Sequence, residues 1–278
     1  MLQSSKISIW FLGVLGVLLM GSCDNGDGVL FSVDDDIKLG QQVSEKIDST
    51  NRAQGKLIER NSSSAKDQQA YQHLDKIVNR VLNSGKVKYR QEFPWSVKLI
   101  KDDQTLNAFA TPGGHIYVYT GLIKYLADED HFAGVLAHEI AHADRRHSAK
   151  QLQRDYGIAL LLSVALGNDP GTLQQIAAQL TGSLAGLKFS RDAETEADSY
   201  AVEYLGGTNY YACDGVAGFF QKLEQDAAQS GAPPEFLSTH PNPGNRIEQI
   251  SQKAEKEGCK ITSAPDTDFN QLKNALNL

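Results

Sequence analysis

The chain has 278 residues, of which 41% are hydrophobic and 22% are charged, and this length is enough to bury a large core. Its 8 prolines and 24 glycines are too few for a collagen-like or low-complexity chain. Acidic residues outnumber basic ones by 34 to 27, which gives a net charge of −7, and the basic residues form no block. Because binding to nucleic acid needs clustered cations, we expect no nucleic-acid partner.

The first 22 residues are predicted to be a signal peptide. Lys6 is the only charged residue in this segment, and the apolar stretch Ile7–Met20 follows it. This stretch is short for a transmembrane helix, which needs about 20 apolar residues, and small residues separate it from Cys23. The ending resembles that of a bacterial lipoprotein signal, in which the cysteine becomes the lipidated first residue. An uncleaved anchor, or a signal cut elsewhere, is the alternative.

The rest of the chain is expected to form a lipidated tether over residues 23–33, one folded domain over 34–260, and a C-terminal tail over 261–278 with room for one more helix. Two further cysteines, Cys213 and Cys259, lie 46 residues apart in the folded domain. In an oxidising envelope compartment they can pair. The sequence leaves open whether they form a disulfide or remain two thiols, because it does not give the distance between them.

Helical periodicity and strand alternation predict a mostly helical α+β fold with a small β-sheet. Asp34–Asp36 favour the start of a helix because acids stabilise the positive end of the helix dipole. The other predicted elements, in chain order, are a helix over Ala65–Asn83, a half-buried strand around Trp95–Leu99, two short strands at Leu106–Ala110 and His115–Tyr119 that flank the turn Thr111–Gly114, and an apolar core helix over Ile158–Leu166.

The strongest chemical signal is the HExxH motif, His138-Glu139-Ile140-Ala141-His142. Residues four apart share one face of a helix, so both imidazoles can point at one metal ion. Glu139 lies one step round the helix, where its carboxylate can reach a metal-bound water. The sequence therefore predicts a zinc centre immediately after the small sheet.

Zinc needs a third protein ligand, which leaves its fourth position for water. The metzincin spacing is absent, because Arg145 and Ser148 stand where that pattern requires glycine and histidine. His147 is one residue away from the required position and is expected to pack against its helix or to cap it.

The next acidic segment, Ser190–Asp198, offers a third ligand. Glu194 and Asp198 are four apart and share a helical face, whereas Glu196 points roughly the opposite way. One carboxylate of the pair can bind zinc while the other supports a ligand histidine. The alternative is an ordinary charged helix in contact with solvent.

HExxH followed by Ser-Arg-x-x-Glu-x-x-Ala-Asp resembles the HtpX-type zinc metallopeptidases, which are related to CAAX prenyl proteases and belong to peptidase family M48 among the gluzincins. The resemblance runs from about Asp34 to Ile250. Transmembrane helices of the membrane-embedded members have no counterpart after the signal, so the chain resembles the soluble periplasmic branch, which is often lipid-anchored and acts in envelope protein quality control. Three further stretches carry the resemblance: Asn107–Val118, Arg146-His147-Ser148, and Ser238–Pro241 with Arg246-Ile247.

This resemblance implies that His138, His142 and Glu194 bind one zinc ion and that Asp198 supports a ligand histidine. Independently of the resemblance, zinc would lower the pKa of a bound water, and Glu139 would take its proton and pass it to the leaving amine.

The developing oxyanion needs a further donor, and His240 and Arg246 are the expected ones, because family members hold this pair near the metal. In some relatives the histidine instead plugs the zinc. The sequence leaves both roles of His240 open, together with a plain loop before a helix.

The expected function is a zinc endopeptidase that acts on unfolded, misfolded or stalled envelope proteins. It would lie on the periplasmic side of a bacterial membrane, held by lipid on Cys23, and the strand Asn107–Ala110 would pair with an extended substrate. One alternative is a zinc-stabilised, chaperone-like binding lipoprotein with little turnover. Another is metal-dependent hydrolysis of a non-peptide envelope component, such as a cell-wall cross-link.

Overall fold

A computed structural model of the chain describes residues 30–181, 188–230, 236–241, 244–259 and 262–278. The signal peptide 1–22 and most of the tether, including Cys23, lie outside the described residues. The expected mostly helical α+β fold is confirmed. Its elements are α1 (Val33–Ala53), β1 (Leu57–Ile58), α2 (Ala65–Leu82), β2 (Ser96–Ile100), β3 (Ala108–Ala110), the short 3₁₀ turn η1 (Pro112–Gly114), β4 (His115–Tyr119), α3 (Thr120–Tyr125), α4 (Glu129–Asp144), α5 (His147–Tyr156), α6 (Ile158–Ala165), α7 (Pro170–Leu180), α8 (Arg191–Thr208), α9 (Gly215–Ser230), α10 (Phe236–Thr239), α11 (Arg246–Glu257) and α12 (Thr267–Leu276).

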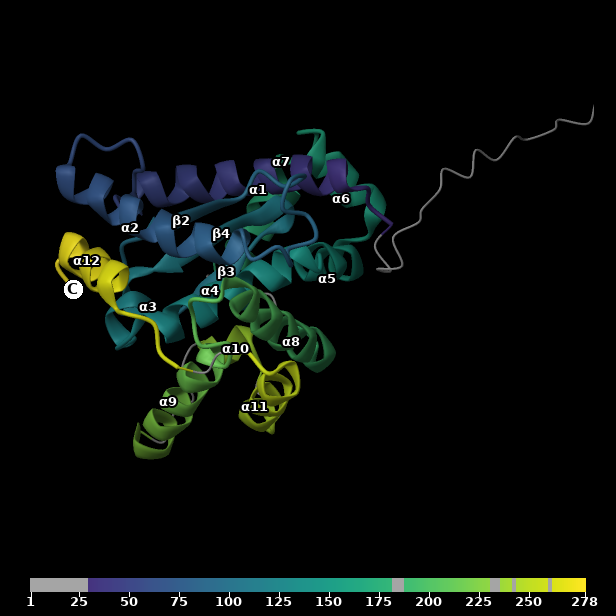
Figure 1. The fold of residues 1–278 in the computed structure, drawn as a ribbon. Helices are drawn as coiled ribbons and strands as arrows, with labels where there is room; N and C mark the ends of the chain where they lie inside the picture. The colour runs from purple at the N-terminus through teal and green to yellow at the C-terminus, as the bar shows by residue number, and fades with distance from the viewer. Residues whose placement is uncertain (1–29, 182–187, 231–235, 242–243, 260–261) are drawn as a thin grey trace, which may run out of the picture.

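The sheet separates two groups of helices (Figure 1). Its strands lie in the order β1-β2-β4-β3, with β2 parallel to β4 and β3 antiparallel to β4, so β3 is an edge strand. Successive β4 side chains point to opposite faces. Ile116 and Val118 join a core with α2 and α4, whereas Tyr117 and Tyr119 join a core with α1 and α5–α7. The sheet therefore has a buried helix, α4, on one of its faces.

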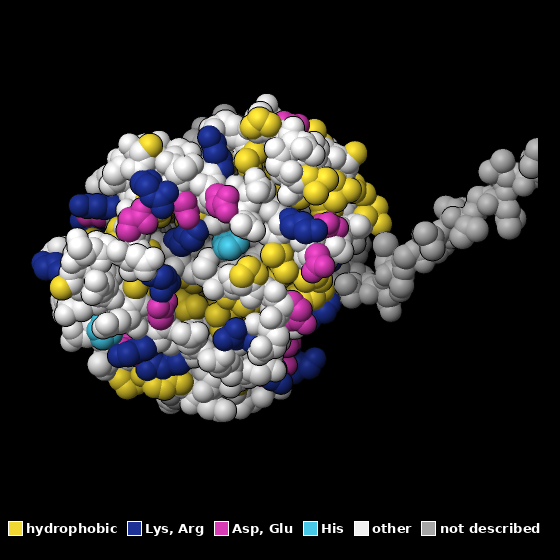
Figure 2. Space-filling model, turned by 90° about the horizontal axis from the view of Figure 1, so that it is seen from above, with side chains coloured by type: hydrophobic (Ala, Val, Ile, Leu, Met, Phe, Trp, Pro, Cys, Tyr) yellow, Lys and Arg dark blue, Asp and Glu magenta, His cyan; other side chains and the backbone are white. Residues whose placement is uncertain are grey.

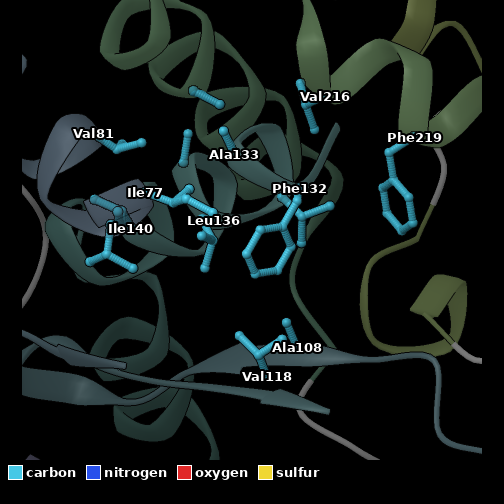
Figure 3. Packing of buried hydrophobic residues seen from close by; sticks show 14 of the residues in the cluster. Ile77, Val81, Ala108, Val118, Phe132, Ala133, Leu136, Ile140, Val216 and Phe219 are labelled. Carbon is cyan, nitrogen blue, oxygen red and sulfur yellow. The ribbon is translucent and has the colours of Figure 1, made fainter. Parts of the chain in front are cut away.

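Helix α4 lies at the centre of the larger core, and its apolar residues are all buried. Figure 3 shows its side chains packed among residues of α2, α9 and the strands: Phe132, Ala133, Leu136 and Ile140 of α4 with Ile77, Val81, Val216, Phe219, Ala108 and Val118. Each of the buried Val, Leu, Ile and Phe side chains in this set contributes about 1.5–3 kcal/mol relative to an exposed one. This packing fixes the helix that carries the HExxH motif.

Most predicted elements form close to their expected bounds. The helix predicted over Ala65–Asn83 is α2, which Ser64 caps, and the strands around Thr111–Gly114 are β3 and β4. The acids Asp34–Asp36 occupy the first turn of α1, and Ser32 caps that helix. The prediction of a core helix over Ile158–Leu166 is only partly right, because α6 buries one face and Leu166 is 67% exposed.

Both ends of the described chain are packed into the fold. Phe31, within the predicted tether, is buried beside α1, and Val33 begins α1. The segment 261–278 contains α12, which packs along α2 and buries Phe269 and Leu272 completely. No helix among the described residues is both long and apolar enough to cross a membrane.

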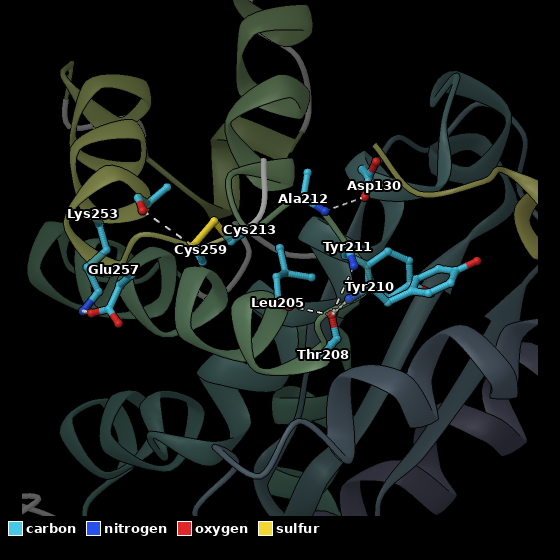
Figure 4. The surroundings of a disulfide bond; sticks show 11 residues. Asp130, Leu205, Thr208, Tyr210, Tyr211, Ala212, Cys213, Lys253, Glu257 and Cys259 are labelled. Carbon is cyan, nitrogen blue, oxygen red and sulfur yellow. Dashed lines mark hydrogen bonds and ion pairs between the residues drawn. A yellow bond between two sulfur atoms is a disulfide. The ribbon is translucent and has the colours of Figure 1, made fainter. Parts of the chain in front are cut away.

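A disulfide joins Cys213 to Cys259 (Figure 4). Cys213 lies just before α9, and Cys259 lies just after α11. The backbone beside Cys213 is itself held, because the Ala212 N–H donates to the Asp130 carboxylate of α4 at 2.8 Å. The disulfide thus ties α11, whose first residue is Arg246, to the part of the chain that packs on α4.

Candidate metal centre

The side chains of the HExxH motif project from α4 into the interior of the protein. Asp128 caps the start of α4 by accepting a hydrogen bond from the His131 N–H, and the helix continues without a break to Asp144. His138, Glu139 and His142 are all 0% exposed. The helical spacing therefore puts the two imidazoles on one face, as the sequence predicts.

Four side chains converge on a single point in this interior. The Nε2 atoms of His138 and His142 are 2.9 Å apart, and Glu194 of α8 places Oε1 3.4 Å from His142 Nε2. His240, which follows α10, brings its Nδ1 to 3.4 Å from His138 Nε2 and 3.3 Å from Glu194 Oε1. All four ligand atoms lie within 4.8 Å of one another.

This donor set fits a zinc ion. Ligand atoms at about 2.1 Å from a tetrahedral zinc are roughly 3.4 Å apart, which matches most of the separations above. Charge gives a second test, because the buried carboxylates Glu139, Glu194 and Asp198 face one buried guanidinium, Arg246. A divalent cation would balance the remaining negative charge, and uncompensated charge in an interior is costly.

Asp198 and Arg246 brace the cluster from one side. Asp198 Oδ1 is 2.9 Å from the Nδ1 of His138, the nitrogen that faces away from the convergence point. Arg246 binds Asp198 through Nε and Nη2, and its Nη2 is also 2.8 Å from Glu194 Oε2. The guanidinium lies over the ring of Phe220, with Cζ 3.8 Å from the ring centre. Both predicted carboxylates of α8 are thus beside the motif.

These contacts shift the protonation of the cluster. Burial alone would raise the pKa of Glu194, but its contacts with His240, His138 and His142 lower it well below the usual value. Burial also disfavours a charged His138, yet Asp198 and Glu194 raise the pKa of this imidazole to about 9. Burial, together with the neighbouring His138, lowers the pKa of His142. A cation that binds here would therefore displace a proton from His138.

Glu139 differs from its neighbours because it has no hydrogen bond with any described residue. Neither carboxylate oxygen of Glu139 is paired within the described part of the chain, and its nearest ring nitrogen is His240 Nε2 at 3.5 Å. His240 Nε2 and Arg246 Nη1 are also buried without a hydrogen bond from described residues. Since buried polar groups are nearly always paired, these atoms mark a place prepared for a polar occupant. Burial raises the pKa of Glu139, which suits a general base.

Aromatic rings that the sequence did not single out cover the centre. Phe236 of α10 stacks on His240 with ring centres 4.3 Å apart, and Phe189 stacks on His142 at 4.0 Å. Phe189 lies directly before the Ser190 cap of α8, so only its place in the chain could have drawn attention to it. The rings exclude solvent from the ligand nitrogens, and the structure therefore describes a closed centre.

His147 and Glu196 are closer to the centre than expected. The N-cap of α5 is Arg146, and His147 is the first residue of that helix, with its Nδ1 3.0 Å from the Nδ1 of His142. Glu196 does point away from the convergence point, yet its Oε2 is 3.2 Å from His147 Nε2. The expected packing of His147 is confirmed, and its contacts with His142 and Glu196 are additional to it. In the sequence, only the resemblance of the Arg146-His147-Ser148 stretch to family members pointed to a role for His147 near the motif.

A helix that presents two histidines and an unpaired glutamate, with a carboxylate from a second helix completing the ligand set, defines a metal-dependent hydrolase centre of the HExxH kind. Comparisons with known proteins agree with this assignment. A model of peptidase family M48 matches residues 68–254, which is more than half of the chain. The chain belongs to peptidase family M48, and its enzyme class is metallopeptidase, as the sequence predicts.

Several characterised proteins are similar to this chain. The β-barrel assembly-enhancing protease of Yersinia pestis is 33% identical over 193 residues, which cover 66% of this chain and 38% of that protein. The protein of the same name from Escherichia coli K12 is 34% identical over 170 residues, 58% of this chain and 34% of its own length. The mitochondrial metalloendopeptidase OMA1 of Schizosaccharomyces pombe is 29% identical over 184 residues, 65% and 52% respectively. The match thus spans about a third to a half of each relative.

Proposed function

We propose that this chain is a zinc endopeptidase that cleaves misfolded or stalled proteins of the cell envelope. The observation that carries the proposal is Glu139, a fully buried carboxylate that has no hydrogen bond from the described residues and lies beside four converging ligand atoms. A structural glutamate at such a place would be paired. Relatives named for β-barrel assembly support an envelope role, and mixed nitrogen and carboxylate ligands support zinc.

Each residue of the centre has a proposed role. His138, His142 and Glu194 hold the metal, which supplies Lewis acidity and lowers the pKa of a water. Glu139 takes the proton of the attacking water and returns it to the leaving amine. Arg246 binds Asp198 and Glu194 through Nε and Nη2, while its Nη1, which has no hydrogen-bond partner among the described residues, is the donor for the oxyanion.

His240 is proposed to close the centre in the resting enzyme. Its Nδ1 is one of the four atoms that lie within 4.8 Å of one another, and Phe236 stacks on its ring. In that position it would occupy the place that a substrate carbonyl or water needs. His240→Ala is then expected to raise the rate of peptide cleavage a few-fold. If His240 serves instead as the main oxyanion donor, the same variant would lose about 10²-fold in kcat.

A matched control for that variant is His131→Ala. His131 lies on the same helix as the motif, is partly exposed and pairs with Asp128, away from the ligand cluster. It is expected to change cleavage by less than twofold. A fall in activity of His240→Ala beyond the control would contradict the plug.

An extended polypeptide is the proposed substrate. β3 is an edge strand, and Phe109 and Ala110 line a small cavity together with Phe189, Thr239 and His240. Antiparallel pairing to a strand edge recognises backbone and not sequence, which suits a protease of unfolded chains. In the closed form Ser148 Oγ donates to the Ala110 carbonyl at 2.7 Å, so a pairing substrate would have to displace or share that bond.

Cleavage of casein by the wild-type chain and by Glu139→Gln tests the function. The wild type should degrade casein, whereas the variant should retain zinc and lose cleavage. Equal activity in the two proteins would remove the catalytic role and favour the chaperone-like alternative. Cleavage of peptidoglycan fragments with intact casein would favour the cell-wall alternative instead.

We further propose that lipid on Cys23 holds the enzyme at the periplasmic side of a bacterial membrane. Six residues lie between Cys23 and Leu30, so seven Cα–Cα steps limit their distance to about 25 Å. Leu30 is 60% exposed, and its N–H donates to Gln153 of α5, next to α6. Apolar side chains gather over α6 and α7 on the face seen in Figure 2. The apolar surface over α6 and α7 would lie against the bilayer.

Membrane partitioning separates the contribution of the lipid on Cys23 from that of the apolar surface over α6 and α7. Cys23→Ser should move the protein from the detergent phase to the aqueous phase. In that background, Leu166→Glu should further weaken binding to phosphatidylglycerol-containing vesicles, because Leu166 is 67% exposed at the end of α6. Unchanged partitioning of Cys23→Ser would show that lipidation is not the anchor, and unchanged vesicle binding of Leu166→Glu would exclude the α6 face.

A further inference from the structure

His147 and Glu196 lie on the outer side of His142. His147 is only 2% exposed, and its two ring nitrogens contact different partners. Nδ1 is 3.0 Å from His142 Nδ1, and Nε2 is 3.2 Å from Glu196 Oε2. A line of contacts therefore runs from the metal centre through two imidazoles to a carboxylate on α8.

The positions of the ring protons determine which group donates and which accepts in each of these hydrogen bonds. If His142 binds the metal through the lone pair of Nε2, the proton of the neutral ring is on Nδ1. The Nδ1 atom of His147 must then accept that hydrogen bond, so the proton of His147 is on Nε2. Glu196 Oε2, an acceptor only, faces that N–H. The hydrogen-bonding roles of His142, His147 and Glu196 are therefore mutually consistent. In this arrangement the lone pair of His142 Nε2 remains available to bind the metal.

We propose that His147 and Glu196 are positioning residues that fix the tautomer and the ring orientation of His142 for the metal. This inference rests on the proposed zinc site. His138 has the shorter version of the same support, since Asp198 Oδ1 is 2.9 Å from its Nδ1. The two ligand histidines are thus held differently: one by a carboxylate directly, the other through a second imidazole. Such supporting partners contribute to metal affinity in many sites.

The local backbone is built to hold His147 in this place. Arg146, which precedes it, adopts a left-handed conformation with φ 59° and ψ 30°, and this turn ends α4 and begins α5. That conformation is unfavourable for a residue other than glycine by roughly 1–2 kcal/mol. Arg146 remains because its buried guanidinium donates to Asp36 Oδ2 at 2.7 Å and to the Phe31 carbonyl at 2.7 Å.

Zinc affinity, measured by competition with a chromogenic chelator, tests the inference without using activity. His147→Leu removes both hydrogen bonds and should raise the zinc Kd about 10–100-fold. His147→Gln should recover part of that loss, because its amide offers an acceptor and a donor. Glu196→Ala should raise the Kd about 10-fold. Substitution with Co²⁺ should show a changed visible spectrum in His147→Leu, since one ligand ring is no longer held.

Two controls separate this effect from the loss of a surface charge. Glu203→Ala removes another partly exposed carboxylate of α8, paired with Lys253 at 2.7 Å and distant from the ligands. Arg145→Met removes the second partner of Glu196, whose Oε1 is 2.8 Å from Arg145 Nε, and leaves His147 in place. Both variants should keep the zinc Kd within about threefold of the wild-type value.

The outcomes are distinguishable. A wild-type chain that binds no zinc would defeat the proposed function and the inference together. A wild type that binds zinc tightly, with a Kd that neither His147→Leu nor Glu196→Ala changes relative to Glu203→Ala, would overturn the inference alone. If His147→Leu does not fold, as judged by circular dichroism, then Glu196→Ala decides the question, because Glu196 is partly exposed and its loss leaves no cavity.

Discussion

Helix α4 carries two glutamates that are both 0% exposed, Glu129 in its first turn and Glu139 in the HExxH motif. The oxygens of Glu129 accept hydrogen bonds from Arg80 at 3.0 Å, from the Tyr211 hydroxyl at 3.0 Å and from the backbone N–H of Phe269 at 3.0 Å. The oxygens of Glu139 accept none from the described residues. Within the described part of the chain, one helix therefore buries one carboxylate with several hydrogen bonds and another with none.

Hydrogen bonding distinguishes the structural glutamate, Glu129, from the proposed catalytic one, Glu139, whereas burial does not, because both are fully buried. A buried charge that is left unpaired costs several kcal/mol, so a fold keeps it only where something else uses it. Glu129 joins α4 to α2 and to the start of α12, which accounts for the packing of the C-terminal segment. Glu139 faces the ligand cluster with its proton-accepting atoms free. Burial raises the pKa of both carboxylates, and pairing distinguishes them.

The largest expected effect is on catalysis at Glu139. Glu139→Gln should lower kcat by about 10³-fold, because the amide cannot take the proton of the attacking water. Its stability should equal or exceed that of the wild type, since the substitution removes an unpaired buried charge. Peptide cleavage and urea unfolding of the same preparation measure the two effects. A large loss of stability with catalysis retained would reverse the roles assigned to the two glutamates.

Removal of the metal should have the next largest effect. Because the ion binds the folded state, a chelator should lower the free energy of unfolding by about 4 kcal/mol when zinc is present at about 1,000 times its Kd. Glu139→Gln should respond as the wild type does, because Glu139 is not a ligand. Glu194→Ala, which loses a ligand, should respond little. A chelator effect of equal size in Glu194→Ala would show that the ligand assignment is wrong.

Glu129→Gln should produce the opposite result to Glu139→Gln. It weakens several charge-assisted hydrogen bonds at once and should reduce the free energy of unfolding by about 2 kcal/mol. The specific activity of the folded fraction should stay within about twofold, because Glu129 is ten residues from the motif glutamate and outside the ligand cluster. Loss of activity without loss of stability would contradict a purely structural role.

The sequence predicts those parts of the molecule that local patterns determine. Helical spacing predicts α4 and the pairing of His138 with His142, and the i, i+4 spacing of Glu194 and Asp198 predicts that they reach the centre together. The strands beside the turn at Thr111–Gly114 follow from alternation and turn chemistry. These elements form where they are expected because each pattern agrees with the tertiary contact that its element makes.

Features that depend on distant contacts could not be predicted in the same way. The position of His240 among the ligands depends on how α10 packs, and the placement of α12 depends on Glu129 and α2. His147 deviates by one residue from a known spacing, and it follows the left-handed Arg146 and lies with its Nδ1 3.0 Å from the Nδ1 of His142. Sequence spacing predicts only that His147 packs or caps, because it contains no information on that backbone turn.

The smallest predicted effect is the loss of one of the several hydrogen bonds to Glu129, which tests whether each bond contributes part of the stability. Tyr211→Phe removes one hydroxyl donor and leaves Arg80 and the backbone N–H groups, so it should cost about 1 kcal/mol, half of the cost of Glu129→Gln. Activity should not change. Combined with Glu129→Gln, the loss should be smaller than the sum of the two, because both act on the same hydrogen bond. Strict additivity would mean that the Tyr211 hydroxyl stabilises the fold through its contact with Arg80 at 3.2 Å and not through Glu129, and the contrast between the two glutamates would then rest on Arg80 and the backbone alone.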